Sequence, residues 1–262
     1  IIERDEDVSV ILDDGVVRGD LLIVADGAGT RLRALAGLDF NAVDLPQTAL
    51  AFRANHPIPH NNVSVEIYKS EGAFTLIPLE DENGMPASAI VWMRWHQDAE
   101  RTAVLAKDAL ARAASERANH HFGPLTPIDS PVRFALRIGH APKLHHGRIG
   151  LIGESAHVFP PIGAQGFNTT LLDIEALVSA IGARGASRGA LRAFEATRLP
   201  DIRLRARSIG LLNAVAKSEN AFVQGLRTRA LAAFADIGPV RKLLIARGMR
   251  AQATPASLAS NG

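Results

Sequence analysis

The segment from residue 147 to residue 173 constrains the fold more than any other part of this chain. A short apolar strand at residues 149–152 leads into an acidic turn, a double proline and a glycine-rich loop. Apolar residues then recur from Leu171 to Ile181 at the spacing of an amphipathic helix. This order suits the binding of a flat, anionic, redox-active ring that must lie against backbone.

The residues at the end of this strand favour hydroxyl groups as ligands. Glu154 can accept hydrogen bonds from sugar-like hydroxyls such as a ribityl chain, and Gly153 removes a side chain that would block close approach. Pro160 and Pro161 stiffen the following loop and present an apolar edge. We expect His157, a lone histidine in this stretch, to be a hydrogen-bonded structural residue.

The glycine-rich loop favours an anion. Gly163 and Gly166 allow backbone amides to face a ligand, and we expect the helix to start near Asn168. The unpaired N–H groups and the positive dipole end of that helix would face the same ligand as the backbone amides of the loop. Amides held there would stabilise a reduced flavin, which carries negative charge near N1 and the C2 carbonyl.

The first 44 residues have the pattern of an incomplete α/β domain. Alternating apolar residues predict a β-hairpin over residues 7–19, and the apolar run at 21–25 predicts a strand buried on both faces. Asp26-Gly27 then turns the chain into a helix predicted at residues 30–38. Because a buried strand needs neighbours that this stretch does not supply, we expect a segment to be missing before Ile1.

Residues 45–142 change to the pattern of an inserted domain. Alternating strands separated by turn-forming residues predict an antiparallel sheet, and a mixture of Ala, Glu, Arg and Leu predicts one helix over residues 99–119. We expect Trp92 and Trp95 in the core or at an interface. The predicted strands are residues 49–53, 63–68, 74–79, 89–94 and 132–138.

The predicted fold class is therefore α/β with an α+β insertion. A Rossmann-like domain, residues 1–44 and 143–186, is interrupted by an antiparallel-sheet domain, residues 45–142, and is followed by a helical region, residues 187–262. Helical spacing recurs in that last region at residues 191–199, 202–215 and 222–234, and residues 251–262 have the composition of a disordered end.

Composition and charge exclude several classes of protein. The absence of cysteine excludes thiolate catalysis and cysteine-ligated clusters, so redox chemistry would need a bound organic cofactor. No apolar run reaches the roughly 18 residues of a membrane span, and the histidines are poorly spaced for a metal. The part from Arg184 onward holds 14 Lys/Arg and 4 Asp/Glu, which fits a solvated face or a membrane surface. Aromatic residues there are too sparse to favour nucleic acid.

Two motifs carry a resemblance to a known family. Gly153-Glu154-Ser155-Ala156-His157, with the prolines, glycines and Asp173 that follow, resembles the second FAD motif of FAD-dependent aromatic-ring hydroxylases of the para-hydroxybenzoate hydroxylase fold, in which Glu154 replaces an aspartate. Asp26-Gly27, followed by Thr30 and Arg33, resembles the family's other motif. Residues 158–168 and 247–250 look like the ubiquinone-biosynthesis subgroup, whereas residues 169–172 depart from it.

The resemblance implies an FAD-dependent monooxygenase that uses NADH or NADPH and O2 to hydroxylate a phenolic ring. The substrate would be a prenylated ubiquinone precursor held between the inserted sheet and the flavin loop. The protein would be cytoplasmic, and its basic C-terminal region would bind peripherally to the inner membrane. No catalytic side chain is assigned, and the ADP-binding Gly-x-Gly-x-x-Gly turn is absent. The cofactor-binding residues implied are Asp26, Gly27, Arg33, Gly153, Glu154, Pro160, Pro161, Gly163, Gln165, Gly166, Phe167 and Asn168.

Two alternatives remain open on the residues alone. Ser155 follows a strand in a near match to the Gly-x-Ser-x-Gly nucleophile elbow, which would make the protein a hydrolase. Pro160-Pro161 argue against it because an elbow needs a helix directly after the serine. The chain is alternatively a truncated flavin fold that serves only as a binding or structural piece.

Overall fold

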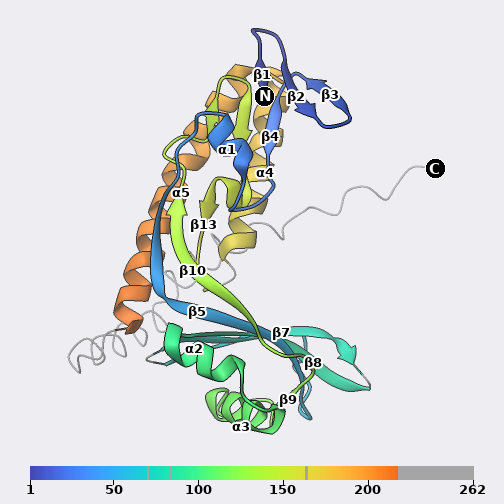
Figure 1. Cartoon of the computed structure of the whole chain (residues 1–262), viewed down its shortest axis with the longest axis vertical. Helices are drawn as coiled ribbons and strands as arrows, with labels where there is room; N and C mark the ends of the chain where they lie inside the picture. The colour runs from blue at the N-terminus through green and yellow to red at the C-terminus, as the bar shows by residue number, and fades with distance from the viewer. Residues whose placement is uncertain (70, 83, 163–164, 218–262) are drawn as a thin grey trace, which may run out of the picture.

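The computed structural model describes residues 1–69, 71–82, 84–162 and 165–217, and it is elongated (Figure 1). Two small sheets, α1 and α4 gather at one end, and α2 and α3 lie at the other end, beneath a large sheet. The long strands β5, Asn41–Asn55, and β10, Val132–His140, connect the two ends. The predicted fold class, α/β with an α+β insertion, is confirmed.

The sheet at the first end brings distant parts of the chain together. β4, Leu22–Val24, runs parallel to β12, Ile149–Leu151, and β11, His145–His146, pairs with the other side of β12. The predicted hairpin is confirmed as β2, Val8–Leu12, and β3, Gly15–Gly19, and β1, Ile2–Glu3, adds a third strand.

The inserted region forms a seven-stranded sheet in the order β13-β10-β5-β8-β7-β6, with β9 pairing off β5. Its β-strands pair antiparallel, as predicted. β5 also pairs with β10 through residues 41–44, so it crosses the boundary predicted between residues 44 and 45. The division into domains stays a prediction. The remaining strands of this sheet are β6, Val65–Lys69, β7, Gly72–Glu82, β8, Met85–Trp95, β9, Thr126–Pro127, and β13, His157–Val158.

The bounds of two predicted helices need correction. The helix predicted at 99–119 is two helices, α2, His96–Ala103, and α3, Lys107–Arg117, because the chain leaves helical geometry at Val104 with no Gly or Pro to mark the break. α1 covers only Arg31–Leu35, capped by the Thr30 side chain and ended before Gly37, which has φ +66°.

The helices α4, Gln165–Arg184, and α5, Arg188–Lys217, pack on the small mixed sheet. Helical spacing identified residues 191–199 and 202–215 as separate segments, and α5 joins them through Pro200. Leu199 and Ile202, on either side of the proline, are both buried in the core, and this packing offsets the backbone hydrogen bond that proline removes. The predicted helix 222–234 and disordered residues 251–262 lie outside the described residues.

Each face of the large sheet has its own core. Leu50, Phe74 and Trp92 pack with α2 and α3 on one face, which confirms Trp92 as a core residue. Ala73 and Met93, their chain neighbours, point to the other face and pack with Ile162 of the proline loop. The strand alternation therefore separates a helix-covered face from a face turned toward the motif at 153–173.

Candidate functional site

The two sequence motifs meet at one edge of the small mixed sheet. Leu22 lies opposite Ile149 and Val24 opposite Leu151 in a parallel register. Because both strands end at the same edge, the turn at Asp26 and the turn at Gly153 leave the sheet side by side. The structure therefore brings together the motifs that the sequence carries more than 100 residues apart.

Hydrogen bonds lock these two turns to each other. Ser155 Oγ lies 2.7 Å from the Val24 carbonyl oxygen and 2.8 Å from that of Ile152, so these two acceptors share its one proton. The Ile152 N–H donates to the same Val24 oxygen at 3.1 Å. Arg33 Nη1, from α1, donates to the Ser155 carbonyl at 2.9 Å. The edge is thus a fixed platform and not two independent loops.

Arg33 occupies the centre of this platform. Its guanidinium carbon lies 4.2 Å above the Phe40 ring, and Nη2 also donates to the Ala28 carbonyl at 3.4 Å. Burial lowers the pKa of Arg33, and the charge of Asp26 partly offsets that shift. The interaction of Asp26 with Arg33 is electrostatic, with no direct ion pair between them among the described residues. Asp26 is exposed, which leaves its carboxylate accessible to a ligand.

Gly153 has a conformation and a position that exclude a side chain. Its φ is +62°, and an added Cβ would lie 3.2 Å from Cγ2 and 3.3 Å from Oγ1 of Thr170 on α4. The neighbour that requires a glycine here is therefore α4. Glu154 follows in a short 3-10 turn, η1, Gly153–Ser155, and its side chain is exposed at the edge.

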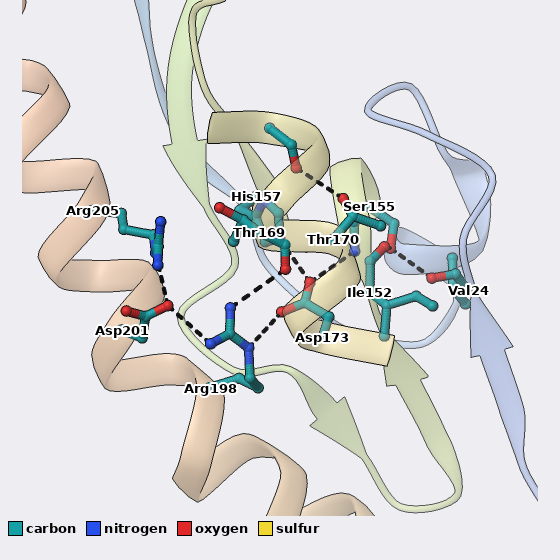
Figure 2. A network of polar contacts seen from close by, with 12 residues as sticks. Val24, Ile152, Ser155, His157, Thr169, Thr170, Asp173, Arg198, Asp201 and Arg205 are labelled. Atoms are coloured by element: carbon teal, nitrogen blue, oxygen red, sulfur yellow. Dashed lines mark hydrogen bonds and ion pairs between the residues drawn. The ribbon is translucent and has the colours of Figure 1, made fainter. Parts of the chain in front are cut away.

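A buried carboxylate on α4 anchors the second motif (Figure 2). Asp173 is fully buried and accepts hydrogen bonds from the Gly153 N–H at 3.1 Å and His157 Nε2 at 2.7 Å on one oxygen, and from Arg198 Nε at 2.8 Å on the other. The expected structural role of His157 is confirmed by this bond. His157 also stacks on Phe159, with ring centroids 5.1 Å apart.

The polar network continues onto α5 (Figure 2). Arg198 donates to the Thr169 carbonyl and pairs with Asp201 at 2.9 Å, and Arg205 pairs with the same Asp201 oxygen at 2.8 Å. Burial raises the pKa of Asp201, but the hydrogen bond from Arg205 and the charges of both arginines outweigh that effect and leave the pKa below 3.8. This network fixes α4, α5 and the turn at Gly153 relative to one another.

The start of α4 differs from our prediction. We expected the helix near Asn168, but Gln165 is already helical, so the residues from Gln165 to Asn168 form its first described turn. Thr170 Oγ1 donates to the Gly166 carbonyl four residues earlier and supports this extra turn. Gly163 lies outside the described residues, and only the backbone of Gln165 is described.

The loop that precedes α4 links the edge to the large sheet. Pro160 is buried, Pro161 is half-buried, and the Ile162 N–H donates to the Pro160 carbonyl at 2.7 Å. Phe167, in the first turn of α4, is 72% exposed, and outside the backbone of the helix itself no described atom lies within 4 Å of a Cβ added at Gly166. Backbone in the first helical turn is therefore open to a ligand.

The site offers chemistry that fits a flavin. Gly27, at φ +92°, and Gly29 also have open space where a Cβ would stand, so a flat ligand can approach the backbone there. Exposed carboxylates at Asp26 and Glu154 can accept from hydroxyl groups, and the first turn of α4 supplies N–H donors and a positive dipole end. The described residues contain no group of three or more metal-ligating side chains.

The residues that bond to the two turns were not predicted from the sequence. Arg198 could not be assigned because helical spacing identifies a buried face of α5 but not the carboxylate that the face meets. The hydroxyl of Ser155 is fully buried and donates to backbone carbonyls, and His157 Nε2 is bonded to Asp173. The geometry therefore opposes a nucleophile elbow, which must expose its serine.

Comparison with known proteins gives one family and a consistent set of relatives. A sequence model of the family described as "FAD binding domain" matches residues 7–204. Ubiquinone hydroxylase UbiL of Rhodospirillum rubrum is 27% identical over 256 residues, which cover 95% of this chain and 59% of that protein. The chain spans about half the length of the curated relatives it matches.

Solved structures share the fold at lower identity. The p-nitrophenol 4-monooxygenase PnpA of Pseudomonas putida DLL-E4 superposes with a TM-score of 0.70 at 18% identity, over 93% of this chain and 63% of that one. The Diels-Alderase PyrE3 also gives a TM-score of 0.70, at 20% identity, over 94% of this chain and 53% of that one. Since these two proteins differ in the activity that their names state, this likeness shows the fold alone.

Proposed function

Because this chain belongs to the FAD binding domain family, whose sequence model matches residues 7–204, we propose that it forms the flavin and substrate part of an FAD-dependent monooxygenase. The enzyme would use NADH or NADPH and O2 to hydroxylate a phenolic ring. The observation that carries this proposal is the single edge at which the Asp26 turn, the Glu154 turn and the first turn of α4 meet.

The residues of this edge divide the binding of FAD between them. Glu154 accepts hydrogen bonds from ribityl hydroxyls, and Asp26 with Gly27 serves the pyrophosphate side. Arg33 holds the two turns at their fixed separation through the Ser155 carbonyl. The remaining proposed cofactor contacts come from the second motif and the start of α4, namely Gly153, Pro160, Pro161, Gly163, Gln165, Gly166, Phe167 and Asn168.

Bound FAD would supply the redox chemistry that activates O2, and the protein supplies electrostatics and exclusion of water. The N–H groups in the first turn of α4 hold negative charge near the ring without reorganisation, because the Asp173 network fixes that helix in place. Buried Pro160 and Ile162 line the approach from the large sheet with apolar surface and reduce the access of water.

We propose a prenylated phenol of ubiquinone biosynthesis as the substrate. The similarity to ubiquinone hydroxylase UbiL supports this class. None of the described helices combines the length and hydrophobicity of a membrane span. The basic region from Arg184 onward would contact the membrane surface.

A turnover experiment tests the proposal. The chain, preceded by whatever residues its gene encodes before Ile1, is purified and its visible spectrum recorded with added FAD. NADH or NADPH is then supplied with ¹⁸O2 and a prenylated phenol. We expect flavin absorbance, consumption of the nicotinamide and one ¹⁸O atom in the product. A protein that leaves the phenol unlabelled while binding FAD is the non-catalytic flavin piece, and a colourless protein contradicts the proposal entirely.

A further inference from the structure

A pocket of about 310 Å³ lies on the helix-covered face of the large sheet, opposite the face that packs on Ile162. Its walls include Trp92 and Arg94 of β8 and Ala113 and Arg117 of α3. The helix α3, which forms one wall of this pocket, lies on the far side of the large sheet from the edge at which we propose that FAD binds (Figure 1). Nothing in the proposed function uses it.

Two buried donors at this pocket lack acceptors. Arg117 is 7% exposed, and its Nη2 donates to the carbonyls of Gly72 and Ile67, but Nε and Nη1 have no hydrogen-bond partner among the described residues. Trp92 is 3% exposed, and its Nε1 is also without a partner there. Buried donors without acceptors are costly, and both side chains belong to the lining of one pocket, so they indicate a ligand that accepts hydrogen bonds.

The charges around the pocket favour an anion. Glu71 is already engaged by Arg94, with contacts of 2.8 and 3.1 Å. Burial lowers the pKa of Arg117 to about 10, with Glu71 opposing and Arg94 adding to that shift, so Arg117 stays a cation at neutral pH. Lys69 and Arg94 bring the lining to three cations, against the two carboxylates of Glu71 and Glu116. One positive charge is therefore left unbalanced.

We propose that this pocket binds a small organic monocarboxylate. The carboxylate accepts hydrogen bonds from Arg117 and from Trp92 Nε1, and its single charge balances the excess cation. Its apolar body lies against the Trp92 ring and Ala113. An organic acid fits better than an inorganic ion because the pocket has the size of a small-molecule site and its lining includes Trp92 and Ala113 beside the cations.

The test uses Trp92 as the reporter. The chain has two tryptophans, so Trp95→Phe leaves Trp92 as the only source of indole fluorescence. Butyrate is the probe, butyramide its uncharged isostere, and inorganic phosphate the rival anion. We expect a saturable fluorescence change and a raised Tm with butyrate, with at least about tenfold weaker binding of butyramide, because the bond to a charged group is lost.

Variants locate the binding. Arg117→Gln should weaken butyrate binding by about tenfold or more. Ala113→Leu, which fills the pocket from a half-buried position on α3 and keeps every charge, should abolish binding and decides the question where Arg117→Gln fails to fold. Arg112→Gln, which removes an exposed charge from the same helix, should bind as the parent does. Equal binding of butyrate and butyramide, tighter binding of phosphate, or undiminished binding in Ala113→Leu would overturn the proposal.

Discussion

Replacing Asp173 by asparagine should destabilise the fold by about 3 kcal/mol, although the two side chains have the same shape. The carboxylate accepts from three donors, the Gly153 N–H, His157 Nε2 and Arg198 Nε, at 2.7 to 3.1 Å. An amide carries one acceptor oxygen, and its NH2 group would face donors that already point inward. Arg198, whose side chain is 6% exposed, would lose its fully buried counter-ion.

The size of the destabilisation depends on which carboxylates still pair with Arg198 in the Asp173→Asn variant. Breaking a buried ion pair costs about 3–5 kcal/mol, and the lower end applies here because Asp201 still pairs with Arg198 at 2.9 Å. For a chain of this length that corresponds to a fall in Tm of roughly 6–12 °C. Urea unfolding followed by circular dichroism at pH 7 measures the loss directly.

Two controls separate the buried charge from a general sensitivity of α4. Glu175→Gln makes the same chemical change two residues away on the exposed side of the helix and should alter stability by less than about 0.5 kcal/mol. Asp173→Asn combined with Arg198→Met should be less destabilised than the sum of the single variants, because the double variant leaves no unpaired charge. A loss under about 1 kcal/mol for Asp173→Asn, or strict additivity, would refute the reasoning.

Three further predictions follow from the same site. Gly153→Ala should lower stability by about 1–3 kcal/mol in urea, because φ of +62° and the nearby Thr170 both oppose a Cβ, and an unchanged midpoint would contradict this. Arg33→Gln should weaken FAD binding without unfolding the chain, since it releases the Ser155 carbonyl, and an unaltered FAD affinity by fluorescence quenching would count against it. The depressed pKa of Asp201 makes its contribution to stability present above pH 3.8 and lost as the pH falls further, so the stability gap between wild type and Asp201→Asn should close below about pH 4 in acid titrations.

The sequence was most informative where local pattern and topology coincide. The turns at Asp26 and Gly153 each follow a short apolar strand, and parallel strands place such turns at a common edge, so their meeting follows from the fold class. The antiparallel sheet was predicted for the same reason, because alternating apolar residues are a direct consequence of strand geometry. The length of β5 was underestimated, because its residues 41–44 also form backbone hydrogen bonds with β10.

The rest depended on packing that local pattern does not encode. The break at Val104 has no glycine or proline, and Pro200 is tolerated inside α5 because both of its flanks are buried. Arg198 reaches Asp173 only once α4 and α5 are side by side. The contact between Gly153 and Thr170 of α4 was not predicted from the sequence. Contacts between elements decide these features.

The most direct test of the central claim is the affinity for FAD of variants at the shared edge. The account predicts that Glu154→Gln weakens FAD binding by about tenfold, because it loses a hydrogen bond to a charged group, and that Arg33→Gln also weakens it, because the two turns are no longer held together. Glu175→Gln, on α4 but away from the edge, should bind FAD as the wild type does. If the edge variants bind FAD with the affinity of the wild type, the two turns do not form the flavin site and the account is wrong.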